Sequence, residues 1–204
     1  MAPLPFNLLG SIFESGIDAL RESFISASQG LQQKVDEAAK AVEDYQTDLA
    51  NDGEWIGERD PDEGHVIWDQ EQVLEFEIDA AREAHGELRK AYAVAAYHYW
   101  ERSMRKYCKD HKSKHPELVQ KAIAEGFPIS LDLNRVHRLA NALKHNSDSH
   151  GTKLQECWPE VISVLFGPRN HMNWYAAIAL SDAHVHQVFD IIRESGPRSK
   201  LAAA

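Results

Sequence analysis

Apolar residues recur at helical spacing along most of the chain. Near the N-terminus, one such series predicts an amphipathic helix over about residues 6–28, and an alanine-rich series predicts a second helix over 31–49. The polar face of the first helix carries Glu14, Asp18 and Glu22, which have the wrong sign of charge for an anionic lipid surface. We therefore expect this helix to pack in a core or at a dimer interface.

The next segment, residues 51–65, has the composition of a loop. It is rich in glycine and acidic residues and contains Pro61. Its carboxylates lack the spacing of a calcium-binding EF-hand loop, so a solvated acidic loop is the favoured interpretation. This loop is also the strongest candidate for a boundary, between an N-terminal helical segment over 1–50 and a helical domain over 66–199.

Residues 66 to about 110 lack proline, which predicts one very long helix or two helices that meet near Gly86. A short helix is predicted from Pro116 to Ala124, because proline is favoured in a first helical turn and Gly126 follows. The fold is therefore expected to be all-α, a bundle of about six helices with one long central helix or helix pair.

The last third of the chain gives weaker signals. Residues 146–152 resemble a loop, and a short helical segment is predicted over 154–166. Residues 171–180 fit either a strand or an apolar linker. A final helix is predicted after Ser181 as its N-cap, ending at Gly196 and Pro197.

One stretch, residues 130–150, predicts an amphipathic helix with a distinctive polar face. Ser130 is a plausible N-cap. The apolar stripe consists of Val136, Leu139, Ala140 and Leu143. On the opposite face, Arg138 and His145 should lie about 20° apart around the axis and ~10.5 Å along it. Three polar residues flank the pair: Asn134, Asn141 and Lys144.

The Arg-x6-His pattern in R-L-A-N-A-L-K-H resembles the Arg-x4-6-His signature of the HEPN (higher eukaryotes and prokaryotes nucleotide-binding) superfamily. Many of its members are small all-helical dimers that cut RNA without a metal, often as toxins or antiviral effectors. The resemblance covers roughly residues 85–150 and implies a cleft at a dimer interface. The chain departs from the family where Asn, Asp or His usually follows the Arg, because that position is Leu139. Asn141, one turn on, would serve instead.

Metal-free RNA cleavage uses the 2′-hydroxyl of the RNA as nucleophile, and the protein supplies a base, an acid and a cation. His145 suits proton transfer near neutral pH, and Arg138 suits a phosphate. Asn141 would orient the substrate or the histidine. We thus expect Arg138, His145 and Asn141 to be catalytic, with neither metal nor cofactor. The expected substrate-binding residues are Lys144, Asn134, Arg135, Arg102, Arg105 and Lys106.

Charge is distributed unevenly along the chain. The net charge is −10, yet residues 1–90 hold 21 acidic and 7 basic residues, whereas residues 91–204 hold 11 acidic and 15 basic residues. A phosphate-binding surface would therefore be expected in the second half. There, Asp110 is the only acid in the basic run 102–115. The alternative is a basic helix end that complements its own dipole.

The composition is that of an ordinary globular protein, with 43% apolar and 26% charged residues among 204. Two cysteines and the lack of a signal sequence or an apolar run of ~20 residues predict a cytoplasmic protein without a membrane partner. Residues 200–204 are interpreted as a vector-derived tail. The expected partners are RNA, a second copy of the chain, and an antitoxin or regulatory protein.

Two rival functions stay open. One is a non-catalytic helical module that binds a protein or a nucleotide. The other is a metal site built from histidines, which is disfavoured because His184 and His186 would point about 200° apart on a helix. His145 and His150 would converge only if the loop after His145 folded back, and His171 is the remaining candidate ligand.

Overall fold

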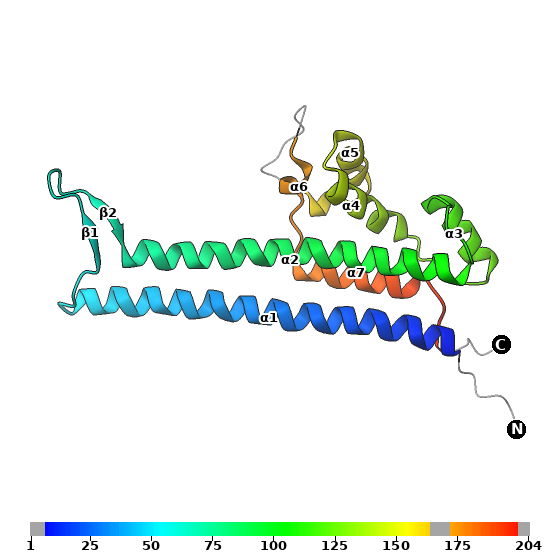
Figure 1. Ribbon diagram of the computed structural model, residues 1–204, viewed down its shortest axis with the longest axis horizontal. Coiled ribbons are helices and arrows are strands. Elements are labelled where there is room, and N and C mark those ends of the chain that lie inside the picture. Colours follow the sequence, from blue (N-terminus) through cyan, green and yellow to red (C-terminus); the bar gives the residue numbers. More distant parts are fainter. Residues whose placement is uncertain (1–6, 164–171, 200–204) are drawn as a thin grey trace, which may run out of the picture. The chain divides into compact units, whose positions relative to one another are not determined.

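The computed structural model describes residues 7–163 and 172–199. Within them, the chain forms seven α-helices, one 3-10 helix and one two-stranded sheet, which confirms the predicted all-α bundle (Figure 1). The described residues divide into two compact units. Unit 1 holds the residues up to Phe24 and from Arg89 onward, and unit 2 holds residues 25–88. The expected vector-derived tail and His171 lie outside the described residues.

Two long helices contribute to both units. Helix α1 spans Leu8–Ala50 and helix α2 spans Gln70–Tyr107. The prediction of separate helices over 6–28 and 31–49 is therefore wrong, whereas a single long helix was one of the two expectations for 66–110. Gly30 and Gly86 both lie inside helical turns. An isolated glycine costs only ~1 kcal/mol relative to alanine, so the flanking helical pattern carries each helix through it.

Unit 2 is a helical hairpin whose ends are joined by a β-ribbon. Its core consists of Val35 and Ala38 of α1 and Ile78 and Ala81 of α2. Strands β1 (Gly57–Arg59) and β2 (Val66–Asp69) pair antiparallel, so the predicted loop over 51–65 contains one strand. The chain reverses direction near Gly64, which has φ +72°. The expected boundary at 51–65 thus falls inside unit 2.

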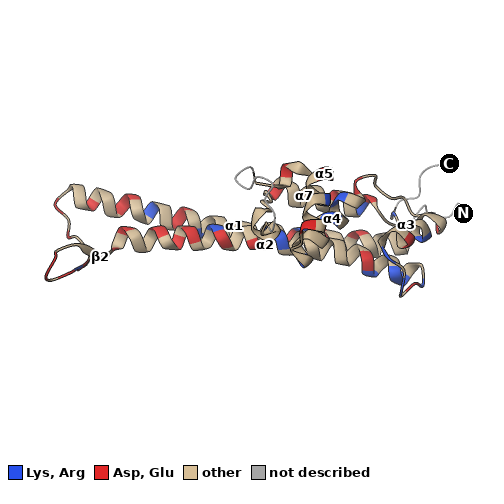
Figure 2. Ribbon diagram, turned by 90° about the horizontal axis from the view of Figure 1, so that it is seen from above, with Lys and Arg blue, Asp and Glu red and all other residues tan. Residues whose placement is uncertain are grey.

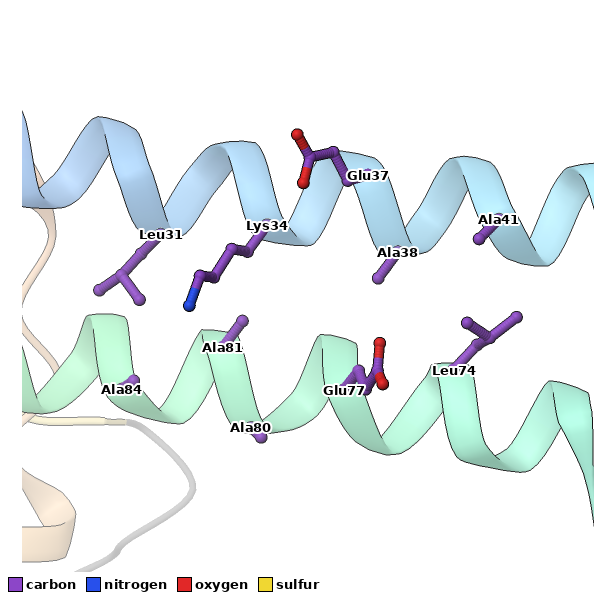
Figure 3. A pocket seen from close by; sticks show the side chains of 10 residues that line it. All are labelled: Leu31, Lys34, Glu37, Ala38, Ala41, Leu74, Glu77, Ala80, Ala81 and Ala84. Carbon is purple, nitrogen blue, oxygen red and sulfur yellow. The ribbon is translucent and has the colours of Figure 1, made fainter.

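An apolar groove of ≈ 600 Å³ runs along the hairpin. Five alanines line much of it: Ala38, Ala41, Ala80, Ala81 and Ala84. Lys34 and Glu77 extend into the space between the two helices (Figure 3). The short alanine side chains do not fill the space between the two helices, which leaves the groove open.

Unit 1 contains the larger core and the remaining helices. These are α3 (His115–Ala124), α4 (Leu133–His145), α5 (Asp148–Cys157), α6 (Trp174–Ala177) and α7 (Asp182–Glu194), with a 3-10 helix over Pro159–Val161. Helix α7 packs on the unit 1 portions of α1 and α2. Phe189 lies 6.2 Å from Phe24 between ring centroids, and the Trp100 indole donates to the Ser195 carbonyl.

Two predicted helix starts in unit 1 are confirmed. Helix α3 begins one residue before Pro116. Helix α7 follows Ser181, whose hydroxyl accepts a hydrogen bond from the His184 backbone N–H while the His184 side chain accepts one from the Ser181 N–H. Local sequence is sufficient to predict both helix starts. The Ser181 side chain pairs with an otherwise unpaired backbone donor of the first turn, and Pro116 has no backbone donor to pair.

Three other local predictions are wrong. Asp132, not Ser130, occupies the N-cap position of α4. Residues 148–152 belong to α5, because the left-handed Asn146 (φ 44°) ends α4 and Ser147 directly starts a new helix. The ambiguous segment contains α6 and an isolated bridge between Ile162 and Ile178. The short helical segment expected over 154–166 is present in part, as the end of α5 up to Cys157 and the 3-10 helix over Pro159–Val161. Residues 164–166 lie outside the described part.

None of the helices in the described residues combines the length and apolar composition needed to cross a bilayer.

Candidate functional site

Helix α4 buries one side and leaves its polar side accessible. Its buried residues are Leu133, Val136, Leu139, Ala140, Ala142 and Leu143. Arg138 and Asn141 are half-buried, whereas Lys144 and His145 are exposed. The predicted separation of an apolar stripe from the Arg138 and His145 face is therefore present in the fold.

The polar side of α4 is divided between two surroundings. Asn141 and Lys144 line a cavity of unit 1, together with His137 one turn before Asn141. Arg138 and His145 are not among the residues that line it. The His145 ring instead stacks on His150 of α5, with ring centroids 4.9 Å apart. The three expected catalytic residues thus share one helix but not one cavity.

The cavity has a volume of ≈ 420 Å³ and is formed by three separate parts of the chain. Helix α2 contributes Tyr97, His98, Glu101 and Arg105. The turn before α3 and the first residues of α3 contribute Lys112, Ser113, Lys114, His115 and Pro116. Helix α4 contributes His137, Ala140, Asn141 and Lys144. Polar and ionisable side chains dominate this lining. By contrast, the groove of unit 2 is lined mainly by alanine and leucine.

Two stacked imidazoles form one wall of the cavity. The rings of His115 and His137 lie 3.8 Å apart between centroids and are nearly parallel, at 11°. The Tyr97 hydroxyl lies 3.0 Å from His115 Nδ1. The Asn141 carboxamide nitrogen lies 2.8 Å from His137 Nε2. Because this nitrogen donates, His137 accepts at Nε2, and its neutral ring carries the proton on Nδ1.

Burial holds both imidazoles in their neutral form. It lowers the pKa of His115 to about 4, with Arg138 adding to the effect and Glu101 opposing it. Burial lowers the pKa of His137 to about 3, and repulsion from Arg138, and from His115 once that ring is protonated, adds to the effect. Near pH 7 these rings therefore offer hydrogen bonds and apolar contact, and neither carries a charge.

A carboxylate and an arginine form an ion pair on the α2 side of the cavity. Arg105 Nη2 lies 2.9 Å from Glu101 Oε1, and His98 Nδ1 lies 3.4 Å from Glu101 Oε2. Burial acts to raise the pKa of Glu101, but hydrogen bonds and positive charge from Arg105 and His98 outweigh it and lower the pKa. Glu101 is thus an anion that fixes the position of Arg105.

A buried aspartate shapes the turn that carries Lys112 and Lys114. Asp110 Oδ1 accepts hydrogen bonds from the backbone N–H groups of Lys112 and Ser113, at 2.9 and 3.0 Å. Lys121 Nζ lies 2.7 Å from Asp110 Oδ2. These hydrogen bonds, that of Lys121 first, hold the pKa of Asp110 well below its usual range. The only acid of the basic run is therefore engaged in holding the turn.

The other predicted substrate-binding residues are dispersed. Arg102 and Lys106 are exposed on α2 and are not among the lining residues. Arg135 forms an ion pair with Asp132 at 3.2 Å. Asn134 is exposed and borders a smaller cavity on the other side of His115. Of the predicted set, Arg105 and Lys144 are the two that line the larger cavity.

Sequence reasoning missed Tyr97, His115 and His137. His137 was detectable in principle, because it lies four residues before Asn141 and such pairs face each other on a helix. Nothing in the sequence indicates that His115 stacks on it, since the two belong to different helices. In the described parts of the chain, no group of three His, Cys, Asp or Glu side chains is arranged to hold a metal ion.

Comparisons of this chain with family models, with curated proteins and with solved structures find no match.

Proposed function

We propose that unit 1 binds RNA and cleaves it without a metal at the polar face of α4. The observation that carries this proposal is the placement of Arg138 and His145 on the accessible side of a helix whose other side is buried. This is the Arg-x6-His pattern that resembles HEPN ribonucleases. Arg138 would bind the scissile phosphate, and His145 would transfer protons.

The chemistry needs only groups that the chain supplies. A base takes the proton of the 2′-hydroxyl, the O2′–P bond forms, the P–O5′ bond breaks, and an acid protonates the leaving O5′. The products are a 2′,3′-cyclic phosphate and a 5′-hydroxyl. In a homodimer with two such faces across its axis, one His145 would act as base and the partner copy's histidine as acid. Arg138 would stabilise the phosphorane charge.

Charge supports unit 1 as the RNA-binding part. Unit 2, residues 25–88, holds 18 acidic and 4 basic residues, a formal charge of −14, so the rest of the chain carries +4. Figure 2 shows acidic residues predominating along α1 and α2 toward β2. The exposed Arg102 and Lys106 of α2 are suited to contact RNA phosphates.

The decisive experiment incubates the protein with RNA in excess chelator. We expect products with 2′,3′-cyclic phosphate ends, and a rate that falls by roughly 10²–10⁴ in the Arg138→Ala and His145→Ala variants. Matched controls are Arg82→Ala and His65→Ala, which remove exposed residues of the same types from unit 2. Intact RNA, or Arg138 and His145 variants that cleave as the wild type does, would refute the proposal.

A second candidate function is binding without cleavage. Leu139, which follows Arg138, is fully buried, and Asn141 is hydrogen-bonded to His137. The carboxamide expected to assist catalysis is therefore already engaged. In this case RNA stays intact, and removal of Arg138 or His145 changes the assembly of the protein or its binding to a nucleotide or a protein partner.

The cellular role follows the same proposal. A metal-independent ribonuclease of this kind would act in the cytoplasm as a toxin or antiviral effector, and an antitoxin or regulatory protein would restrain it. Both cysteines are free, which suits a reducing compartment. Host growth during expression of the wild type, compared with that of the Arg138→Ala, His145→Ala double variant, tests this role.

A further inference from the structure

The cavity between α2, α3 and α4 has a strong excess of positive charge. Its lining includes four cationic side chains: Arg105, Lys112, Lys114 and Lys144. Glu101 is the only carboxylate in the lining, and Arg105 pairs with it. Counted from its lysines, arginine and glutamate alone, the lining therefore carries a formal charge of +3.

Two polar nitrogens of lining residues lack hydrogen-bond partners. Arg105 Nη1 and His137 Nδ1 are buried, and neither bonds to any residue in the described ranges. A buried donor without a partner costs roughly 1–3 kcal/mol. Such donors are retained where another group satisfies them or where they serve a function.

The cavity also adjoins the N-terminus of a ten-residue helix. Lys114 is the N-cap residue of α3, and its side chain makes no capping hydrogen bond. The helix dipole places partial positive charge at this end, which adds to that of Lys112 and Lys114. Side chains and backbone therefore favour the same kind of ligand, an anion with several acceptor oxygens.

We propose that this cavity binds a small phosphomonoester. A phosphomonoester carries about −1.5 to −2 charges at pH 7 and three strong acceptor oxygens, whereas a carboxylate carries a single charge. The volume of ≈ 420 Å³ falls within the ~300–1,000 Å³ of small-molecule pockets. The phosphate would contact Arg105 and the lysines. The stacked imidazoles and Tyr97 would provide a flat, uncharged wall for the rest of the ligand.

This inference does not depend on cleavage at Arg138 and His145. The same phosphate chemistry occurs in a free nucleotide and at the phosphorylated end of an oligonucleotide. Two probes distinguish these sources: adenosine 5′-monophosphate, and a short RNA with or without a 5′-phosphate. Adenosine serves as the uncharged comparison.

The experiment measures binding of these probes to the full chain by calorimetry. We expect adenosine 5′-monophosphate, the 5′-phosphorylated RNA, or both, to bind at least about tenfold more tightly than the unphosphorylated counterpart. The Lys112→Gln, Lys114→Gln double variant should lose about tenfold or more in affinity. The control is Lys34→Gln, Lys40→Gln, which makes the same change of charge at exposed positions of unit 2.

Two further readouts separate a site from general charge attraction and from the proposed cleavage. The imidazole resonances of His115 and His137 should shift on binding, while that of the exposed His65 should not. The Arg138→Ala, His145→Ala variant should keep its affinity for the phosphorylated probe whether or not the wild type cleaves RNA. The inference would be overturned if each phosphorylated probe bound no more tightly than its unphosphorylated counterpart. It would also be overturned if the Lys112, Lys114 variant and the Lys34, Lys40 variant lost the same affinity.

Discussion

At the scale of single residues, the least expected feature is the pair of stacked imidazoles. His115 is buried and His137 is half-buried, and each ring has a hydrogen-bond partner, in Tyr97 and Asn141 respectively. Face-to-face contact at 3.8 Å is compatible with two neutral rings. Protonation would place positive charge next to Arg138 and the other imidazole. The pair therefore makes the stability of unit 1 sensitive to pH.

The folded pKa values are about 4 for His115 and about 3 for His137, below the ordinary 6.5 of an unfolded histidine. At pH values between the folded and the unfolded pKa, the unfolded chain binds more protons than the folded chain. The free energy of unfolding therefore falls as pH decreases from 6.5 toward 4. The His137→Gln variant should lose less stability than the wild type between pH 7 and about pH 4.5. Urea unfolding at several pH values measures this.

The substitution His65→Gln provides the matched control, because it removes an exposed histidine of unit 2. It shows how far the loss of a histidine outside the stacked pair changes the slope. A His137→Gln variant with an unchanged slope would show that this imidazole titrates alike in the folded and unfolded states.

At the scale of elements, sequence patterns located the helices whose ends are determined locally. Pro116 and Ser181 predicted their helix starts because each acts on its own backbone donors. The break predicted between residues 28 and 31 is absent from α1, since the buried seam through Val35 and Ala38 keeps the helix continuous beyond it. The cavity could not be predicted from the sequence, because it is formed by segments around residues 101, 114 and 141 that only the tertiary fold brings together.

The two glycines inside the long helices lead to a stability prediction. A Cβ at Gly30 or at Gly86 would meet no atom within 4 Å. Gly30→Ala and Gly86→Ala should therefore each raise the free energy of unfolding by roughly 0.5–1 kcal/mol, because alanine loses less backbone entropy in a helix. Chemical denaturation of the single and double variants measures the gain. A loss of stability would indicate that these turns are not helical.

Gly151 in α5 should behave in the opposite way. A Cβ there would come within 1.8 Å of Cδ2 of Trp174, a buried residue of α6. The Trp174 indole is also held by a hydrogen bond to Asp148 of α5, at 2.8 Å. Gly151→Ala should thus destabilise unit 1 by roughly 1–3 kcal/mol, the usual cost of overpacking. Chemical denaturation of Gly151→Ala and Gly30→Ala side by side tests this difference in stability. Equal denaturation midpoints for the two variants would contradict it.

At the scale of the whole molecule, charge is separated between the two units. Unit 2 has a formal charge of −14, and the remainder has +4. If unit 1 binds RNA as proposed, the negative charge of unit 2 would oppose the approach of RNA. The repulsion acts through solvent and weakens with salt, because the screening length falls from about 30 Å at 0.01 M to about 10 Å at 0.1 M.

Neutralising unit 2 should consequently affect RNA binding only in dilute salt. The Glu75→Gln, Glu83→Gln variant changes two exposed acids of α2 and should bind RNA more tightly at about 0.01 M salt. The gain should vanish near physiological ionic strength.

Lys106→Gln should instead weaken binding and lower the salt dependence by about 0.7 in the log–log slope. Filter binding across a salt series distinguishes these results, and a gain that persists at high salt would contradict long-range repulsion.

Trp100 packs against His115, one of the paired imidazoles, and against Tyr97. Its indole is fully buried, and its ring centroid is 5.4 Å from that of His115 and 5.9 Å from that of Tyr97. Imidazolium quenches indole emission, whereas neutral imidazole does so far less. A variant that retains Trp100 as its single tryptophan would therefore report protonation of this wall by a loss of emission in acid, without any added label.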